Sequence, residues 1–301
     1  MSTSEIRVHL NNTGQVLACC GLLLLADLAF GKRVPAEGWF EGGPSHGVFR
    51  LSVPGADTGD PAAAVLEALA TCEITGRKSG QTTHALSLRD PFGLTVDWWL
   101  RRKTMKTWAG RQDPAAIAAA CQAAMRASLR TVLHDPLNFR TVLASAHGRR
   151  KAPESSRKET EPGLRPQSPA PGPGRGRKTG GRKSAPRPLA PLSLDSRLAG
   201  SAIDVGFSHD AMEIPREACP VTELLALAAL QVFQPGEARE AGAAPPVLRY
   251  HTWHVPAPWP VACAVFCGAA WLPGTRSWTF QVTHRDDEGR YKGLSFSREE
   301  V

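Results

Sequence analysis

The residues best suited to chemistry lie between Asp90 and Arg111, where the sequence reads DPFGLTVDWWLRRKTMKTWAGR. Three of the eight tryptophans occur in this stretch beside five cations, and only two carboxylates oppose them. Aromatic rings can stack on bases and cations can neutralise phosphates, so the mixture is typical of a sequence-tolerant nucleic-acid surface. The alternative is a core strand followed by a solvated loop, because most aromatic side chains are buried and most charges contact only water.

Within this stretch, the order of the residues favours the functional interpretation. The apolar run GLTVDWWL ends at Leu100, and the six residues RRKTMK that follow hold four cations before Trp108. Cations and an aromatic ring therefore share a predicted loop, which is where binding residues concentrate.

Two further patterns could serve nucleophilic catalysis. Cys19 and Cys20 lie near the start of an apolar helix, but no histidine base is implied beside them, so we expect buried and inert thiols. The letters of a GxSxG serine motif occur at 43–47. They fall between two short predicted strands, where a plain turn is expected instead of a strand–serine–helix elbow.

A possible metal site is formed by His251, His254, Cys263 and Cys267, which fall within seventeen residues. The usual spacing of two cysteines in a zinc site is absent, and both cysteines belong to an apolar run that predicts a strand facing a core. We therefore expect no metal ion, no cofactor and no catalytic residue in this protein.

The formal net charge of +8 over 301 residues is unevenly distributed. Between Arg149 and Pro191 there are twelve Lys/Arg and three Asp/Glu, whereas the remaining residues carry a net charge of −1. Any surface for polyanions on the folded body is therefore a local patch and not a global field.

The same segment is rich in proline, glycine and serine, which predicts disorder because little apolar surface is available to offset the entropy of ordering. It is either a tolerated insertion or a basic arm that raises affinity for RNA or DNA through counterion release. It also marks the domain boundary. We predict an N-terminal unit at 1–148, a disordered basic linker at 149–191 and a C-terminal unit at 192–301.

Cysteine usage and hydropathy indicate the compartment. Seven cysteines without the spacing of a disulfide scaffold favour free thiols in a reducing cytosol, and so a cytoplasmic protein. The apolar run VLACCGLLLLADLAF begins only at Val16 and contains Asp27, so we expect neither a membrane span nor a signal peptide.

Apolar periodicity and capping residues predict an α+β fold. In the N-terminal unit we expect strands at 5–10, 38–41, 47–53, 85–89 and 94–100, and helices at 15–30, 61–72 and 114–134. The order β-α-β-β-α-β indicates a ferredoxin-like (RRM-type) unit with an extra strand and helix. A helix at 218–233 and strands at 248–253, 259–267, 277–284 and 290–296 predict a smaller α+β unit after the linker.

Several blocks of the sequence, taken in order, resemble a known family: ACCGLLLLADLAF, EGWFEG, LRDPFGLTVDWW with KTWAG, ELLALAALQVFQP and RYHTWHVPAPWPVACAVFCG. They are similar to blocks of the small large-subunit-type (Cas-eight-like) proteins of type I-G (formerly I-U) CRISPR-Cas effector complexes. The resemblance implies a non-enzymatic subunit of an RNA-guided, Cascade-type complex in antiviral defence. Its implied partners are other Cascade subunits, CRISPR RNA or target DNA, and a separate helicase–nuclease, with no membrane.

The resemblance agrees with the nucleic-acid interpretation of residues 90–111, which we call the cation–tryptophan segment, because in RNA-guided systems base pairing reads the sequence while protein reads shape, backbone and a short flanking motif. We expect Trp108 to stack on a base or to wedge at a duplex fork, and Gly110 to allow close approach of the backbone. The expected phosphate contacts are Arg101, Arg102, Lys103, Lys106 and Arg111. Two alternatives remain, a stand-alone RNA-binding module and an enzyme that uses Cys20 or the histidine–cysteine group.

Overall fold

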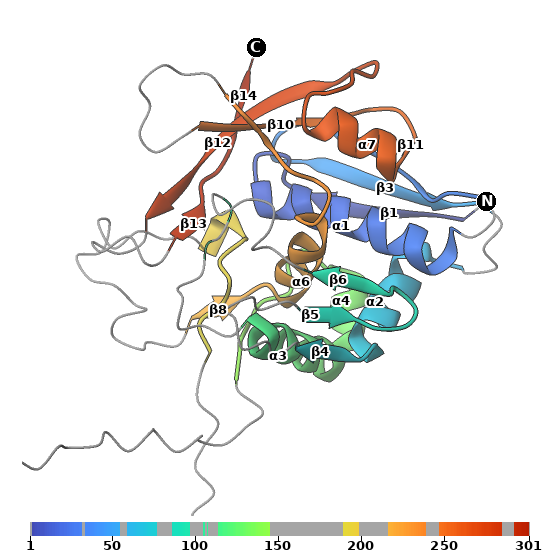
Figure 1. The fold of residues 1–301 in the computed structure, drawn as a ribbon, viewed down its shortest axis with the longest axis vertical. Helices are drawn as coiled ribbons and strands as arrows, with labels where there is room; N and C mark the ends of the chain where they lie inside the picture. The colour runs from blue at the N-terminus through green and yellow to red at the C-terminus, as the bar shows by residue number, and fades with distance from the viewer. Residues whose placement is uncertain are drawn as a thin grey trace, which may run out of the picture.

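The computed structural model describes residues 2–31, 34–54, 59–76, 86–96, 105, 107, 114–144, 189–198, 216–238, 247–284 and 292–300. These residues form six α-helices and several antiparallel sheets, which confirms the predicted α+β class (Figure 1). The predicted basic linker at 149–191 lies outside the described residues except for its last three positions.

The first sheet has four antiparallel strands in the order β1-β3-β2-β11. Alternating burial turns Ile6 and Val8 of one strand, and Phe49 and Leu51 of its neighbour, toward the core. The last strand comes from the far end of the chain and pairs with β2, so distant parts of the sequence share one sheet. Its strands are β1 (Ser2–Val8), β2 (Glu37–Gly42), β3 (Gly47–Val53) and β11 (Ala257–Pro258).

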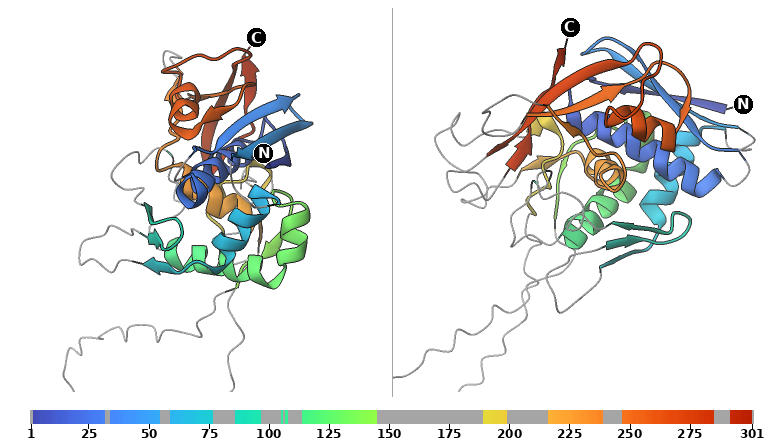
Figure 2. Two further views of the ribbon diagram at one scale, coloured as in Figure 1. Left: turned by 90° about the vertical axis from the view of Figure 1, so that its right-hand side faces the viewer. Right: turned by 45° about the horizontal axis from the view of Figure 1, so that its top comes forward.

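Helix α1 (Thr13–Phe30) lies beneath this sheet and packs along α6 (Pro220–Ala229) (Figures 1 and 2). Asn12 caps its first turn by accepting a hydrogen bond from the backbone N–H of Gln15, and the helix ends at Gly31 as expected. By length and composition α1 could cross a membrane, but 78% of it is buried inside the fold. A core helix of a soluble protein has the same properties.

Two glycines on one side of α1 allow the backbones of other segments to approach closely. A Cβ at Gly14 would lie 2.0 Å from the carbonyl oxygen of Leu194, and a Cβ at Gly21 would lie 2.0 Å from that of Leu225. The two glycines are seven residues apart and therefore lie on the same face of the helix. That face receives both α6 and the segment 189–198.

The second sheet lies beside the start of α1, where the backbone N–H of Ser297 donates to the carbonyl oxygen of Asn11 at 2.8 Å. Its order is β13-β12-β10-β9, with β14 also paired to β12. The Tyr250 hydroxyl donates to the carbonyl oxygen of Leu10 at 2.7 Å, and the Trp253 indole donates to that of Gly38 at 2.7 Å, so this sheet is bonded to the first. The strands are β9 (Gly236–Glu237), β10 (Val247–Thr252), β12 (Arg276–His284), β13 (Lys292–Leu294) and β14 (Arg298–Glu300).

A third layer lies on the side of α1 away from β3 (Figure 2). Asp60 caps α2 and Pro61 opens it, as the sequence predicts. The predicted helix at 114–134 is divided at Ser128 into two helices. The elements are α2 (Pro61–Thr71), the hairpin sheet of β4 (Ile74–Gly76), β5 (Leu86–Leu88) and β6 (Leu94–Val96), α3 (Pro114–Ala127), α4 (Leu129–His134), and the pair β7 (Thr141–Val142) and β8 (Glu217–Ala218).

The strand expected at 259–267 is wrong, because the structure has helix α7 (Trp259–Phe266) there. The run WPVACAVF is apolar throughout, so neither a period of two nor a period of 3.6 residues can be read from it. The indole N–H of Trp259 donates to Asp27 Oδ2 at 2.8 Å, which fixes α7 to the end of α1.

The two predicted units share one hydrophobic core, which holds residues from both sides of the linker, such as Leu23 and Phe40 together with Leu225 and Tyr250. Whether either unit folds alone stays a prediction. After α2 the chain enters the hairpin sheet, so among the described residues no fourth strand of a ferredoxin-like unit lies next to β1.

Candidate nucleic-acid interface

The predicted binding residues Arg101, Arg102, Lys103, Lys106, Trp108, Gly110 and Arg111 lie outside the described residues. Two residues between them are described, namely Met105 and Thr107. Both are buried, with Met105 5% exposed and Thr107 not exposed. These two residues therefore belong to the folded body.

Thr107 forms the attachment through two hydrogen bonds. Its hydroxyl donates to the carbonyl oxygen of Leu192, and its own carbonyl oxygen accepts from the backbone N–H of Lys292 at 2.9 Å. Leu192 directly follows the predicted basic linker, and Lys292 begins β13. Thr107 therefore lies between the end of the linker and the second sheet.

The described residues that flank 145–188 meet close to this attachment. The backbone N–H of Leu189 donates to the carbonyl oxygen of Leu143 at 2.8 Å, so the residues on either side of 145–188 are hydrogen-bonded neighbours. Leu189 is only three residues from Leu192, the partner of Thr107. Thr107, Leu143 and Leu189 thus all contact or belong to the part of the chain where segment 189–198 runs between β8 and β13 (Figure 1).

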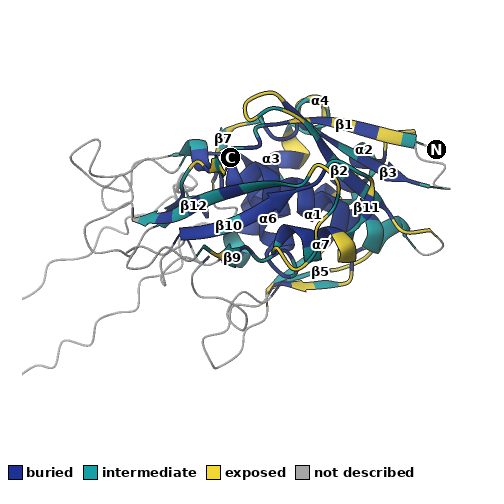
Figure 3. Cartoon of the chain, turned by 90° about the horizontal axis from the view of Figure 1, so that it is seen from above, coloured by how far each residue is buried: buried dark blue, intermediate teal, exposed yellow. Residues whose placement is uncertain are grey.

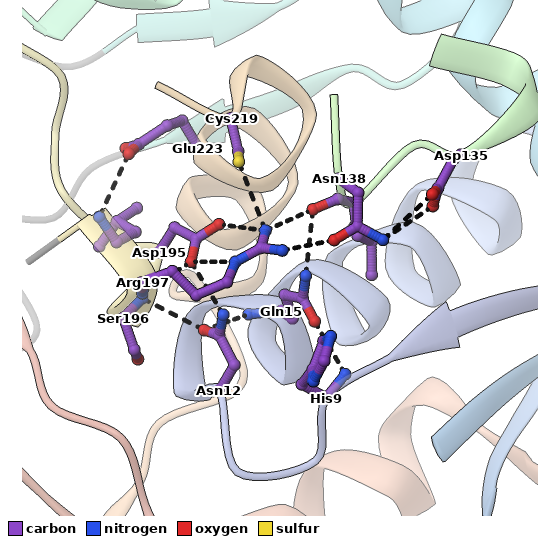
Figure 4. A network of polar contacts seen from close by, with 12 residues as sticks. His9, Asn12, Gln15, Asp135, Asn138, Asp195, Ser196, Arg197, Cys219 and Glu223 are labelled. Atoms are coloured by element: carbon purple, nitrogen blue, oxygen red, sulfur yellow. Dashed lines mark hydrogen bonds and ion pairs between the residues drawn. The ribbon is translucent and has the colours of Figure 1, made fainter. Parts of the chain in front are cut away.

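Segment 189–198 is held by a buried polar network around Asp195 and Arg197, which we call the Asn12–Arg197 network (Figure 4). The Asp195 carboxylate accepts from the guanidinium of Arg197 at 2.7 and 3.0 Å and from the side-chain amide of Asn12 at 2.8 Å. Arg197 also donates to the carbonyl oxygen of Leu137 at 2.7 Å and to the side chain of Asn138. The network thus connects the start of α1, the loop after α4 and the residues that follow the linker.

The charges of this network neutralise one another. Burial acts to raise the pKa of Asp195, but the hydrogen bonds and charge of Arg197, with the bond from Asn12, bring it below its usual value. Burial acts to lower the pKa of Arg197, and Asp195 more than reverses that effect. The pair is therefore ionised and internally compensated. We interpret it as a structural clamp and not as a ligand site.

The thiols are not placed for nucleophilic chemistry. Cys19 and Cys20 are buried as predicted, and burial raises the pKa of each well above its usual value, so a thiolate is disfavoured. The sequence 43–47 is the turn between β2 and β3, as expected.

His251, Cys263 and Cys267 of the possible metal site each form a hydrogen bond with a different partner and not around a common centre. His251 Nδ1 pairs with the hydroxyl of Ser277 at 3.0 Å, whereas the Cys263 thiol donates to the carbonyl oxygen of Val232 at 2.9 Å and that of Cys267 to Ala264 at 3.4 Å. Burial, followed by the charge of Arg249, lowers the pKa of His251. In the part of the chain that the structure describes, no three His, Cys, Asp or Glu residues gather in a way that could hold a metal ion.

The described residues carry little of the positive charge. They contain twelve of the 36 Lys/Arg and fifteen of the 28 Asp/Glu, which is a net charge of −3, so the excess of cations lies in the remaining segments. Five described arginines form ion pairs with carboxylates: Arg7 with Asp135, Arg50 with Glu5 and Glu41, Arg197 with Asp195, Arg249 with Glu300, and Arg276 with Glu299.

Sequence reasoning missed Thr107, Asp195 and Arg197 as the residues that fix the interface. The signal that could have found the last two is the run LSLDSRL, in which apolar residues flank a charged pair directly after the proline-rich linker. No family model, curated protein or solved structure matches the chain.

Proposed function

We propose that this protein is a non-enzymatic, nucleic-acid-binding subunit of an RNA-guided CRISPR interference complex of the Cascade type, and that it works in the cytoplasm. The observation that carries the proposal is the convergence of two basic segments. Thr107, which lies between Lys106 and Trp108, is hydrogen-bonded to Leu192 at the end of the basic linker.

The contact between Thr107 and Leu192 supports a local binding site for polyanions. Lys106 and Trp108 directly precede and follow the buried Thr107 in the sequence. Leu143 and Leu189, which flank residues 145–188, are hydrogen-bonded to each other, and the proposal adds the cations between them to the same site. Since the described body is net negative, phosphates are attracted to this region and not to the surface in general.

The family resemblance supports the proposed place in a multisubunit complex, because the resembling blocks run from α1 to α7. The order β1-β3-β2 with α1 and α2 corresponds to the first five elements of a ferredoxin-like unit, and we include that unit in the proposal. The proposed contacts are those of Arg101, Arg102, Lys103, Lys106 and Arg111 with backbone phosphates, Trp108 with a base, and Gly110 with the approaching strand. Other Cascade subunits, CRISPR RNA or target DNA, and a helicase–nuclease are the proposed partners.

Co-expression tests the proposal most directly. The tagged full-length chain is produced together with the proteins encoded next to it and with a CRISPR transcript, and the purified material is analysed by mass spectrometry and RNA sequencing. We expect neighbouring subunits and processed guide RNA to co-purify in fixed ratio. Recovery of the tagged chain alone would contradict the proposal.

The same preparation separates the proposal from a stand-alone RNA-binding module. Such a module would bind single-stranded RNA with micromolar or tighter affinity in isolation and would recruit no subunit. The proposed subunit binds weakly alone and gains affinity in the complex, because binding through several sites raises the effective concentration at each.

A further inference from the structure

We propose that the outer face of the sheet formed by β9, β10, β12 and β14 binds single-stranded nucleic acid, with one base stacked on Phe296 and an adjacent phosphate at Arg298. The inference rests on the proposed nucleic-acid function. It adds a second site, remote in sequence from the cation–tryptophan segment, and it names the ligand as a single strand.

The two faces of this sheet differ sharply in chemistry. Tyr250, Trp278 and Phe280 alternate along β10 and β12 on the inner face and are at most 3% exposed. Thr279 lies between Trp278 and Phe280, and Gln281 follows Phe280, so both point to the opposite face. Figure 3 views the molecule from above, with β10 and β12 passing in front of α1 and α6.

A bulge turns Phe296 out of the core. Val282 pairs with Leu294 and Thr279 pairs with Arg298, so two residues of β12 face three residues of the partner strand. The extra residue of such a bulge leaves the normal alternation and re-aims its side chain. Ser297 still points inward and bonds to the Tyr250 hydroxyl at 2.6 Å, whereas Phe296 is 49% exposed.

Beside the bulge is an open hollow of about 310 Å³, and its lining includes an aromatic ring, a guanidinium and a side-chain amide. Phe296 supplies an aromatic ring and Arg298 a guanidinium, while the side-chain amide of Gln281 bonds to none of the described residues. Ring, cation and amide can respectively stack on a base, bind a phosphate and bond to a base edge.

The charge around the hollow favours a phosphate. Arg298 has no ion-pair partner among the described residues. The two neighbouring carboxylates are already engaged, since Glu299 pairs with Arg276 and Glu300 with Arg249. An exposed guanidinium beside neutralised acids leaves a local positive charge, which complements a polyanion.

A second exposed aromatic residue extends the face. Trp271 is 65% exposed and lies edge-on against the ring of His251, with 5.2 Å between the ring centroids. His251 pairs with Ser277, which is four residues along β12 from Gln281, or about 13 Å at the rise of a strand. Trp271 and the hollow therefore border one continuous surface on which a short strand can lie.

The test measures binding of a fluorescein-labelled eight-nucleotide oligothymidine to the full-length protein by anisotropy. Phe296→Ala should weaken binding about 5- to 150-fold, which is the range for loss of one stacked base, and Phe296→Tyr should restore it. Arg298→Gln should lower the slope of log affinity against log salt by about 0.7. Arg126→Gln removes an exposed arginine from α3 and is the matched control.

Each outcome bears on one claim. If the wild type binds the oligonucleotide and the Phe296 and Arg298 variants bind equally well with unchanged melting, the sheet face is not the site, although the proposed function stands. No binding of the oligonucleotide by the wild type also overturns the inference. The proposed function is decided separately by the co-purification experiment, which requires neither residue.

Discussion

The hydroxyl of Thr107 donates a hydrogen bond to the carbonyl oxygen of Leu192, although 85 residues separate the two in the sequence. Thr107 lies between Lys106 and Trp108 of the cation–tryptophan segment, and Leu192 directly follows the basic linker. Both are buried, so the bond is shielded from water. The bond connects Thr107, within one basic part of the chain, to Leu192, directly after the other.

Replacement of Thr107 by valine keeps the shape of the side chain and removes the donor. We expect a loss of about 1–3 kcal/mol in the free energy of unfolding, because the buried carbonyl of Leu192 is left without this partner. Chemical denaturation measures the change. Thr107→Ser should retain most of the stability, and a valine variant as stable as the wild type would show that the bond does not form.

Deletion of residues 152–188 should leave the fold intact. The backbone of Leu189 is hydrogen-bonded to that of Leu143, and the eight residues 144–151 remain to close the loop between them. We expect a cooperative thermal transition near that of the wild type, together with weaker nucleic-acid binding at low salt, because cations are lost. Loss of the cooperative transition would mean that the segment contributes to the core.

Gly21→Ala should disrupt the packing of α1 on α6. The added Cβ would lie 2.0 Å from the backbone carbonyl oxygen of Leu225, so the helices must separate, at a cost of about 3 kcal/mol or more. Gly43→Ala is the matched control, since no atom lies within 4 Å of its added Cβ. Equal melting temperatures for the two variants would contradict the close approach of the helices.

Asp195→Asn should alter how stability depends on pH. The pKa of Asp195 is lowered in the folded state, so its carboxylate contributes stability above the unfolded pKa of about 3.9, and that stability is lost as pH falls through the folded pKa. The variant leaves Arg197 buried without its counter-ion, which costs about 3–5 kcal/mol at neutral pH. Its free energy of unfolding should fall less steeply below pH 4. If the free energy of unfolding fell equally steeply in the wild type and the variant, the acid sensitivity would arise from groups other than Asp195.

The helices with clear caps could be predicted from the sequence because their signals are local. Gly31 ends α1, and Asp60 with Pro61 opens α2, as expected, whereas α1 begins at Thr13, two residues before the predicted start. The segment at 259–267 could not be assigned correctly, since an unbroken apolar run has no periodicity and its helical state follows from packing in the fold.

The residues that position the candidate site depend on contacts between distant segments. Nothing near Thr107 in the sequence indicates that it bonds to Leu192, and the Asp195–Arg197 pair acquires its role only when Asn12 lies beside it. Phe296 ends the strand predicted at 290–296, and that prediction does not indicate that its side chain is exposed. The bulge that exposes it is visible only in the register of β12 with its neighbours.

The salt dependence of nucleic-acid binding by the Lys106→Ala, Arg111→Ala double variant tests the central claim most directly. If these cations contact phosphates, the slope of log affinity against log salt should become shallower by about 1.4–1.8, since each lost contact removes about 0.7–0.9. The double variant should melt at the same temperature as the wild type. A slope identical to that of the wild type would contradict the claim that the cation–tryptophan segment binds the polyanion.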